Sequence, residues 1–218
     1  MKKITYLLLI VTGLLFTTLA FTQKDTKAKE ILDKTSAMLN QSGGISASFT
    51  INVNDDANNM KEGFEGQMLL KNTKFFVETP DQKVYFDGKT QWIYFSLFDE
   101  VTILEPSPQD LHSLNPILVF NMYKTDCDYK YNGEKTDNQR RRVHEVSLFP
   151  KKRNEDIKQI NMQINKVDNM PVFFHIIYKN NMELRIHLSK YQTKQNLPDS
   201  QFVFDKNKFP YAEVNDLR

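Results

Sequence analysis

The chain has 218 residues, of which 40% are hydrophobic and 26% are charged, so it is long enough to bury one sizeable core. Its 29 Lys and Arg residues nearly balance its 27 Asp and Glu residues, so it lacks the basic surplus that nucleic-acid-binding proteins normally carry. A single cysteine, Cys127, excludes an internal disulfide, so burial must stabilise the folded state.

Residues 1–22 have the pattern of a secretory signal peptide. Lys2 and Lys3 precede an apolar run, and small residues follow it. The run is short for a membrane span, so we expect cleavage near residues 20–22 and not an uncleaved anchor. Removing these two lysines from the 29 basic residues leaves 27, which equals the number of acidic residues. No linker or repeat divides residues 23–218, which we expect to form one exported, soluble domain.

The first predicted element is an amphipathic helix from Asp25 to Asn40. Asp25 or Thr26 is suited to cap its N-terminus, and Gly43-Gly44 is expected to end it. Its apolar residues recur at the i, i+3, i+4, i+7 spacing of a helix that buries one face. They are Ala28, Ile31, Leu32, Thr35, Met38 and Leu39.

Strand patterns follow the helix. Residues 45–53 alternate apolar and polar side chains with a period of two, which is typical of a strand with one buried face. Residues 64–70 alternate in the same way, and Gly66 in mid-strand indicates a bend or a close backbone approach. Residues 75–78 form a further predicted strand that ends before Pro80.

The stretch from Tyr85 to Ile103 predicts an aromatic hairpin. Asp87-Gly88 favours a type I′ turn, because that turn requires positive φ angles, which glycine adopts freely and aspartate tolerates. No nucleophile, general base or metal-ligand pattern accompanies the stretch, so we interpret it as part of a site that binds an apolar molecule. The apolar side chains flanking the turn are Val84, Phe86, Trp92, Tyr94, Val101 and Ile103.

Residues 105–122 predict two short helices. Ser107-Pro108 and Asn115-Pro116 each place a capping residue before a proline at the first helical position, and Pro116 would break one longer helix. The second helix, from Ile117 to Phe120, is almost wholly apolar. A helix of this kind must be buried, and it is suited to cover the mouth of a cavity.

The C-terminal half again predicts strands. Asn132-Gly133 indicates a turn, and the short connections at Asp168-Asn169 and at residues 179–181 indicate tight hairpins. Successive short turns predict an antiparallel meander. The expected strands are Val143 to Phe149, Asp156 to Val167, Pro171 to Tyr178, Met182 to Tyr191, and a last short strand at Phe202 and Phe204.

The sequence contains no recognisable catalytic or metal-binding pattern. None of its histidines stands at metal-ligand spacing from another histidine, cysteine or carboxylate, and the fingerprints of serine hydrolases, P-loops and dinucleotide sites are absent. We therefore expect no catalytic residue, no bound metal and no cofactor. The histidines are His112, His144, His175 and His187.

Two basic clusters flank the strand predicted at residues 143–149. Arg140-Arg141-Arg142 and Lys151-Lys152-Arg153 are suited to dock an acidic surface or anionic lipid head groups, or to form solvated strand ends. We favour solvated strand ends, because the mature chain has no net charge and no aromatic residues alternate with the basic ones.

Five segments, in order, resemble the periplasmic lipoprotein carrier family LolA over nearly the whole mature chain. They are similar to the family's A-S-F-T strand, its E-G-x-G-x-L-x-x-K segment, its D-G-K-x-x-W-x-Y hairpin with the next strand, its lid helix and its terminal F-x-F segment. In this sequence they are Ala47 to Thr50, Glu62 to Lys71, Asp87 to Tyr94 with Asp99 to Thr102, Asn115 to Leu118, and Phe202 to Val214.

The resemblance implies a mainly β (α+β) fold, in which one strongly curved antiparallel sheet forms an incomplete β-barrel covered by the N-terminal helix and short lid helices. It also implies a monomeric periplasmic carrier, not an enzyme, that shields lipoprotein acyl chains. Its partners would be an inner-membrane ABC transporter as donor and an outer-membrane acceptor. The family often has a lid-holding arginine where Asn72 follows Lys71 here, and Lys74 or Lys89 is the candidate substitute.

We expect apolar side chains of the strands, the hairpin and the second lid helix to line the acyl-chain cavity and its lid. A slip of one residue in strand register would exchange Trp92 and Tyr94 for Ile93 and Phe95. The alternative function is a lipid-sensing or general lipid-binding module of the same fold, and a filled, plain core remains open. The lining and lid residues are Phe49, Met68, Leu70, Phe86, Trp92, Tyr94, Ile117, Leu118 and Phe120.

Overall fold

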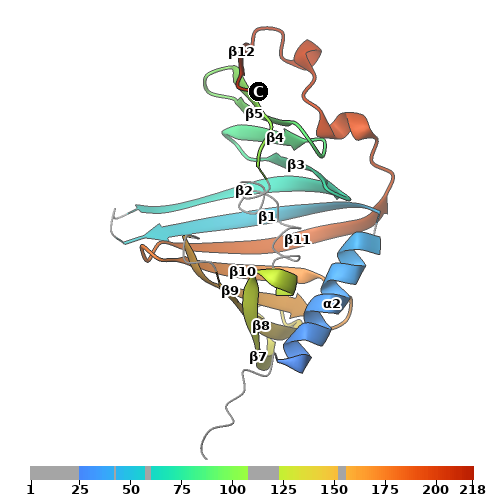
Figure 1. Cartoon of the computed structure of the whole chain (residues 1–218), viewed down its shortest axis with the longest axis vertical. Helices are drawn as coiled ribbons and strands as arrows, with labels where there is room; N and C mark the ends of the chain where they lie inside the picture. The colour runs from blue at the N-terminus through green and yellow to red at the C-terminus, as the bar shows by residue number, and fades with distance from the viewer. Residues whose placement is uncertain (1–24, 42, 57–59, 108–122, 152–155) are drawn as a thin grey trace, which may run out of the picture.

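The computed structural model describes residues 25–41, 43–56, 60–107, 123–151 and 156–218. A twelve-stranded sheet makes up most of this part of the chain, and helix α2 (Thr26–Gln41) lies against it near one end (Figure 1). The signal peptide expected at residues 1–22 and nearly all of the lid region expected at residues 105–122 lie outside the described residues. Within the described ranges, no helix has the length and apolar character to cross a membrane.

The strands match the expected alternation, and several are longer than the patterns indicate. Two 3-10 helices, η2 (Asp199–Phe202) and η3 (Lys206–Lys208), follow the last long strand. The strands are β1 (Gly44–Asp55), β2 (Met60–Lys71), β3 (Lys74–Glu78), β4 (Gln82–Phe86), β5 (Gln91–Phe95), β6 (Glu100–Leu104), β7 (Cys127–Thr136), β8 (Arg142–Pro150), β9 (Ile157–Asn165), β10 (Pro171–Tyr178), β11 (Glu183–Gln195) and β12 (Glu213–Asp216).

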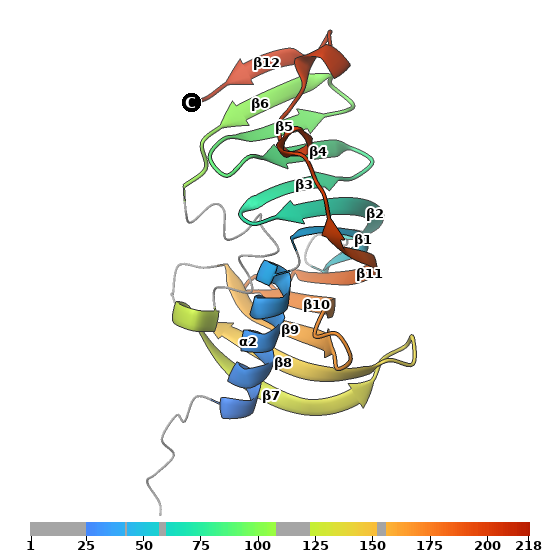
Figure 2. The same cartoon turned by 90° about the vertical axis from the view of Figure 1, so that its right-hand side faces the viewer.

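Two antiparallel meanders, β1 to β6 and β7 to β11, join where β1 pairs with β11. The strand order is β12-β6-β5-β4-β3-β2-β1-β11-β10-β9-β8-β7, with free edges at β12 and β7, so the curved sheet is open (Figure 2). The expected incomplete barrel is confirmed. At one edge of the otherwise antiparallel sheet, β12 pairs with β6 in parallel.

The register gives the sheet two distinct faces. Residues directly opposite in antiparallel strands point to the same side, so Phe49 of β1 shares a side with Leu188 of β11. That side continues through Phe174 and Met162 to Val146 of β8. These side chains pack in one core with the apolar face of α2. We call this side of the sheet the helix face and the opposite side the outer face.

Asp25 fixes α2 to the sheet. Its Oδ1 accepts hydrogen bonds from the backbone N–H groups of Lys27 and Ala28, both at 3.0 Å, which caps the helix. Its Oδ2 accepts from the backbone N–H of Tyr131 on β7 at 2.7 Å. The hydroxyl of Tyr123 donates to Asp33 at 2.6 Å and makes a second link. Between these links α2 buries Ala28, Ile31, Leu32, Thr35, Ser36 and Leu39.

Two predicted turns differ from expectation. The hairpin at Asp87-Gly88 is present, but its connection has four residues, and only Gly88 in it has a positive φ, of 104°. The turn is therefore not type I′; the Asp87 carboxylate instead accepts from the N–H groups of Lys89 and Thr90, both at 2.8 Å. Asn132-Gly133 is a bulge within β7, because the register shifts there and Gly133 has a φ of 106°.

The strand expected at Phe202 and Phe204 is absent. Phe202 ends η2 and is fully buried, and Phe204 lies in irregular chain. The segment crosses the outer face over strands whose backbone groups are already paired on both sides, so it has no free edge to join. The alternation of Phe202 and Phe204 therefore reflects packing and not a sheet ladder.

Replacing Asp25 with Ala should lower the free energy of unfolding by about 2 kcal/mol, because it removes a helix cap and the acceptor for Tyr131. Burial raises the pKa of the Asp25 carboxyl, but backbone hydrogen bonds from Ala28, Tyr131 and Lys27 outweigh it and leave the pKa below its ordinary value. The stabilisation is thus full above about pH 4 and is lost as the pH falls through the lowered pKa. Urea unfolding at pH 7 and pH 3 measures both effects.

The matched control is Asp128→Ala, because the Asp128 side chain is 69% exposed and pairs with Lys151 at the surface. This variant should change the free energy of unfolding by less than about 0.5 kcal/mol. Equal losses in the two variants would contradict the role given to Asp25.

Candidate functional site

Across β1 to β6, the helix face carries two rows of side chains that run perpendicular to the strands. Each member of a row is the direct cross-strand partner of the next. Row one consists of Ile45, Leu70, Phe75, Phe86, Gln91 and Leu104. Row two consists of Ala47, Met68, Val77, Val84, Ile93 and Thr102. Ten of the twelve side chains are apolar, so the rows form a continuous apolar surface.

The two rows differ in burial. Row one is closed to solvent over most of its length, with Phe75 fully buried and the Phe75 and Phe86 rings 5.2 Å apart. Val77, Val84 and Ile93 of row two are only half-buried. Apolar side chains that stay partly exposed on a covered face can bury more surface when a ligand arrives, so row two is the part of this surface best able to bind an apolar molecule.

Gly66 lies beside the rows and permits a close approach by Phe49. A Cβ at Gly66 would come within 2.2 Å of the Phe49 ring and 2.4 Å of the backbone oxygen of Glu78. The ring therefore lies directly over the glycine backbone. The close approach expected from a glycine in mid-strand is confirmed.

Four of the predicted lining residues, Phe49, Met68, Leu70 and Phe86, lie on the helix face and are buried there. Their role in binding an acyl chain stays a prediction. Ile117, Leu118 and Phe120 lie outside the described residues.

Trp92 and Tyr94 lie on the outer face, so the expectation that they share a side with Phe86 is wrong. Phe86 pairs with Gln91, and Tyr85 pairs with Trp92. A connection of two or of four residues pairs Phe86 with an odd-numbered residue of β5, so both place Trp92 and Tyr94 on the opposite side from Phe86; only a connection with an odd number of residues would bring them to its side. Ile93 occupies the helix-face position in row two, which is the result expected if the strand register differs by one residue from the assumed one.

Trp92 and Tyr94 belong to a second core on the outer face. The Tyr94 ring lies 4.3 Å from that of Phe209 and 6.0 Å from that of Phe204. Val101 and Ala212 are buried in the same cluster. The sequence pattern does not indicate this cluster, because the alternation of Phe202 and Phe204 is typical of a strand. The C-terminal segment thus covers the outer face of the aromatic hairpin.

Lys74 and Lys89, the candidate lid holders, have partners among the described residues, and so does the neighbouring Lys71. Lys71 and Lys74 both donate to Asp199 of η2, at 3.0 Å and 2.6 Å, and Lys71 also donates to the carbonyl of Leu197 at 2.7 Å. The hydrogen bonds from Lys74 and Lys71 hold the pKa of the Asp199 carboxyl below its ordinary value. These contacts attach the start of the C-terminal segment to the β2–β3 hairpin. Lys89 pairs with Glu105 at 3.0 Å.

The two basic clusters do not form one surface, because they lie at opposite ends of β8. Arg141 pairs with Asp137 at 2.7 Å, and Arg142 pairs with Glu134 at 3.0 Å. Lys151 pairs with Asp128, and Lys152 and Arg153 lie outside the described residues. These pairings favour solvated strand ends over a docking patch.

Two cavities open mainly on the outer face and have polar linings. One, of about 420 Å³, includes Ser48, Thr50, Glu65 and Gln67. The other, of about 600 Å³, includes Arg141, Arg185 and His187. Burial lowers the pKa of the His187 imidazole, so this side chain is mainly neutral at pH 7. Neither lining suits an acyl chain, and among the described residues no group of His, Cys, Asp or Glu is placed to hold a metal ion.

Comparison with known proteins gives a family match and fold neighbours. The family model described as outer membrane lipoprotein carrier protein LolA matches residues 18–177. An uncharacterised conserved protein from Thermus thermophilus superimposes with a TM-score of 0.60 at 16% identity, covering 88% of this chain and 99% of its own. Lipoprotein LppX from Mycobacterium tuberculosis gives a TM-score of 0.50 at 10% identity, covering 80% and 100%. No curated protein sequence matches the chain.

Replacing Phe204 with Ala should lower the free energy of unfolding by about 2 kcal/mol, because Phe204 packs against Tyr85, Tyr94 and Phe209. It should also shift the fluorescence of Trp92, the one tryptophan in the chain, to longer wavelength, because the cover over the outer face loosens. Denaturant unfolding followed by tryptophan emission measures both.

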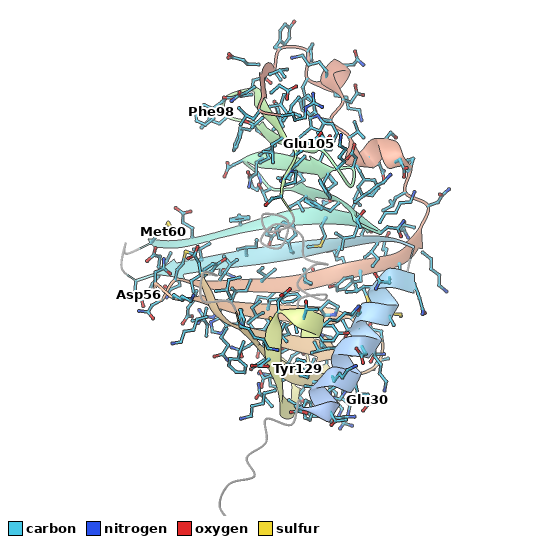
Figure 3. All side chains as sticks on the ribbon, in the orientation of Figure 1. Glu30, Asp56, Met60, Phe98, Glu105 and Tyr129 are labelled. Atoms are coloured by element: carbon cyan, nitrogen blue, oxygen red, sulfur yellow. The ribbon has the colours of Figure 1, made fainter. Side chains whose placement is uncertain are left out.

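Phe98→Ala is the control. Phe98 is 73% exposed in the β5–β6 turn, and it points away from the sheet (Figure 3). It should leave both the stability and the emission maximum unchanged. An unshifted Trp92 emission in the Phe204 variant would contradict the position given to the C-terminal segment.

Proposed function

The chain belongs to the LolA family of outer membrane lipoprotein carrier proteins, and from this premise we propose that it is a periplasmic carrier for the acyl chains of lipoproteins. The chains would bind to the two apolar rows on the helix face of β1 to β6 and travel from the inner to the outer membrane. The observation that carries this proposal is row two, in which Val77, Val84 and Ile93 stay half-buried on a face that α2 covers only in part.

The dimensions of the rows suit an acyl chain. Six strands spaced about 4.8 Å apart make each row roughly 24 Å long. One acyl chain spans about half of the ~30 Å hydrocarbon thickness of a bilayer, or about 15 Å. A chain that lies across the strands can therefore contact apolar side chains along its whole length.

The energetics suit transfer between binding sites. Each methylene removed from water contributes about 0.8 kcal/mol, so several acyl chains together exceed the practical affinity limit of about 21 kcal/mol. The relevant competitor is therefore a membrane or another protein and not water. Small affinity differences along the route are then sufficient to move the cargo.

Family membership and the N-terminal pattern support the proposed route. We infer that residues 1–22 are a cleaved signal peptide and that residues 23–218 form the carrier domain. An inner-membrane ABC transporter would supply the lipoprotein, and an outer-membrane acceptor would receive it from the monomeric carrier. Neither step requires catalysis by this chain, and we assign it no catalytic residue, metal or cofactor.

Replacing Val84 or Ile93 with Asn should weaken binding of a fluorescent acyl probe about tenfold, because each removes roughly 1.5 kcal/mol of apolar contact from row two. Both side chains are half-buried, so the variants should still fold. The control is Val167→Asn, because Val167 is 88% exposed in a turn. If all three variants bind the probe like the unmodified chain, the rows are not the binding surface.

The carrier role has its own test in cells and in purified protein. Native mass spectrometry of the chain isolated from the periplasm should show lipid or lipoprotein adducts. Depletion should strand lipoproteins in the inner membrane. Depletion that leaves lipoprotein sorting intact and alters only a transcriptional response would support a lipid sensor in place of a carrier.

A further inference from the structure

Gln91 is a buried amide in the apolar surface of row one. Its side chain is 0% exposed, and its Oε1 and Nε2 have no hydrogen-bond partner among the described residues. Its direct cross-strand neighbours are Phe86 on β4 and Leu104 on β6. An unpaired buried amide destabilises the folded protein, so packing does not explain a glutamine where leucine or methionine would fill the same space.

The strand backbone directs Gln91 to the helix face. Alternate residues of β5 point to opposite sides, and Trp92 next to it lies on the outer face. Gln91 therefore projects toward the surface that we propose binds acyl chains, and the present inference rests on that proposal. It is the one amide in the two rows, and the other polar member is Thr102.

The chemistry of the amide selects a kind of ligand group. Nε2 offers two donors and Oε1 offers an acceptor. An ester linkage presents a carbonyl oxygen to these donors, and an amide linkage presents both a carbonyl and an N–H. A carboxylate would need a compensating charge when buried, and the two cross-strand neighbours, Phe86 and Leu104, carry none.

We propose that Gln91 hydrogen-bonds the carbonyl of the ester or amide linkage that attaches an acyl chain to its carrier molecule. The site then prefers linked acyl chains to bare hydrocarbon and to free fatty acid. Gln91 also sets the position of the chain. From β5 to β1 the neighbouring row two extends about 19 Å, so an acyl chain of about 15 Å fits along it between the linkage at Gln91 and Ala47.

The test compares three pyrene probes with the same chain: the methyl ester of pyrenedecanoic acid, the free acid, and a pyrenyl alkane. The unmodified chain should bind the ester about tenfold more tightly than the alkane or the ionised acid, the difference expected for one net hydrogen bond. Gln91→Met should remove this preference by weakening ester binding about tenfold, without weakening alkane binding. It should also raise the melting temperature, because an unpaired amide is removed.

Gln67→Met is the matched control. Gln67 is exposed and pairs with Ser48 on the outer face, so this variant should keep the ester preference. Equal binding of ester and alkane by the unmodified chain, or an equal loss for both in Gln91→Met, would overturn the assignment of Gln91 and leave the proposed function standing. Binding of no probe at all would count against the proposed function itself.

A readout that needs no variant is isotope-edited infrared spectroscopy of the ester labelled with ¹³C at the carbonyl. A hydrogen bond from Gln91 should lower the stretching frequency of the bound carbonyl below its value in hydrocarbon solvent. A bound carbonyl with the frequency of the hydrocarbon solution would overturn the inference, whether or not the Gln91 variant folds.

Discussion

The pairing of β1 with β2 on one side and β11 on the other is the constraint on which the rest of the structure depends. This one strand joins two meanders that are otherwise separate along the sheet. Its register also gives the helix face its continuity, because Phe49 and Ile51 oppose Leu188 and Ile186. A shift of one residue in β1 would turn the apolar residues of one meander away from those of the other.

The two faces of the sheet are covered in different places. On the helix face α2 lies against the end of the sheet formed by β7 to β10, and Tyr129 of β7 faces it there (Figure 3). On the outer face the C-terminal segment packs over the hairpin of β4 and β5, through Phe204 and Phe209. In the described part of the chain, the half-buried part of row two lies beyond both α2 and the C-terminal segment. The binding surface that we propose is this stretch of apolar sheet.

The sequence was sufficient for the fold because its alternation is regular and its turns are short. Residues 171–178, for example, were predicted as a strand with the observed bounds. The sequence was insufficient where a single residue in a turn decides which side of the sheet a side chain occupies. The side of the sheet occupied by Trp92 depends on whether the turn after Phe86 has an even or an odd number of residues, and hairpin turns of two, three and four residues all occur. Gln91 was not recognised, because a single glutamine in a strand gives no sign that it is buried and unpaired.

The most direct test of the central claim is to locate a bound lipid by intermolecular nuclear Overhauser effects in the methyl-labelled protein. The account predicts contacts between the methylenes of a bound lipopeptide and the methyl groups of Met68, Val84 and Ile93. It predicts none to Ile103, which lies on the outer face behind Trp92. Contacts to Ile103 without contacts to the row-two methyl groups would contradict it.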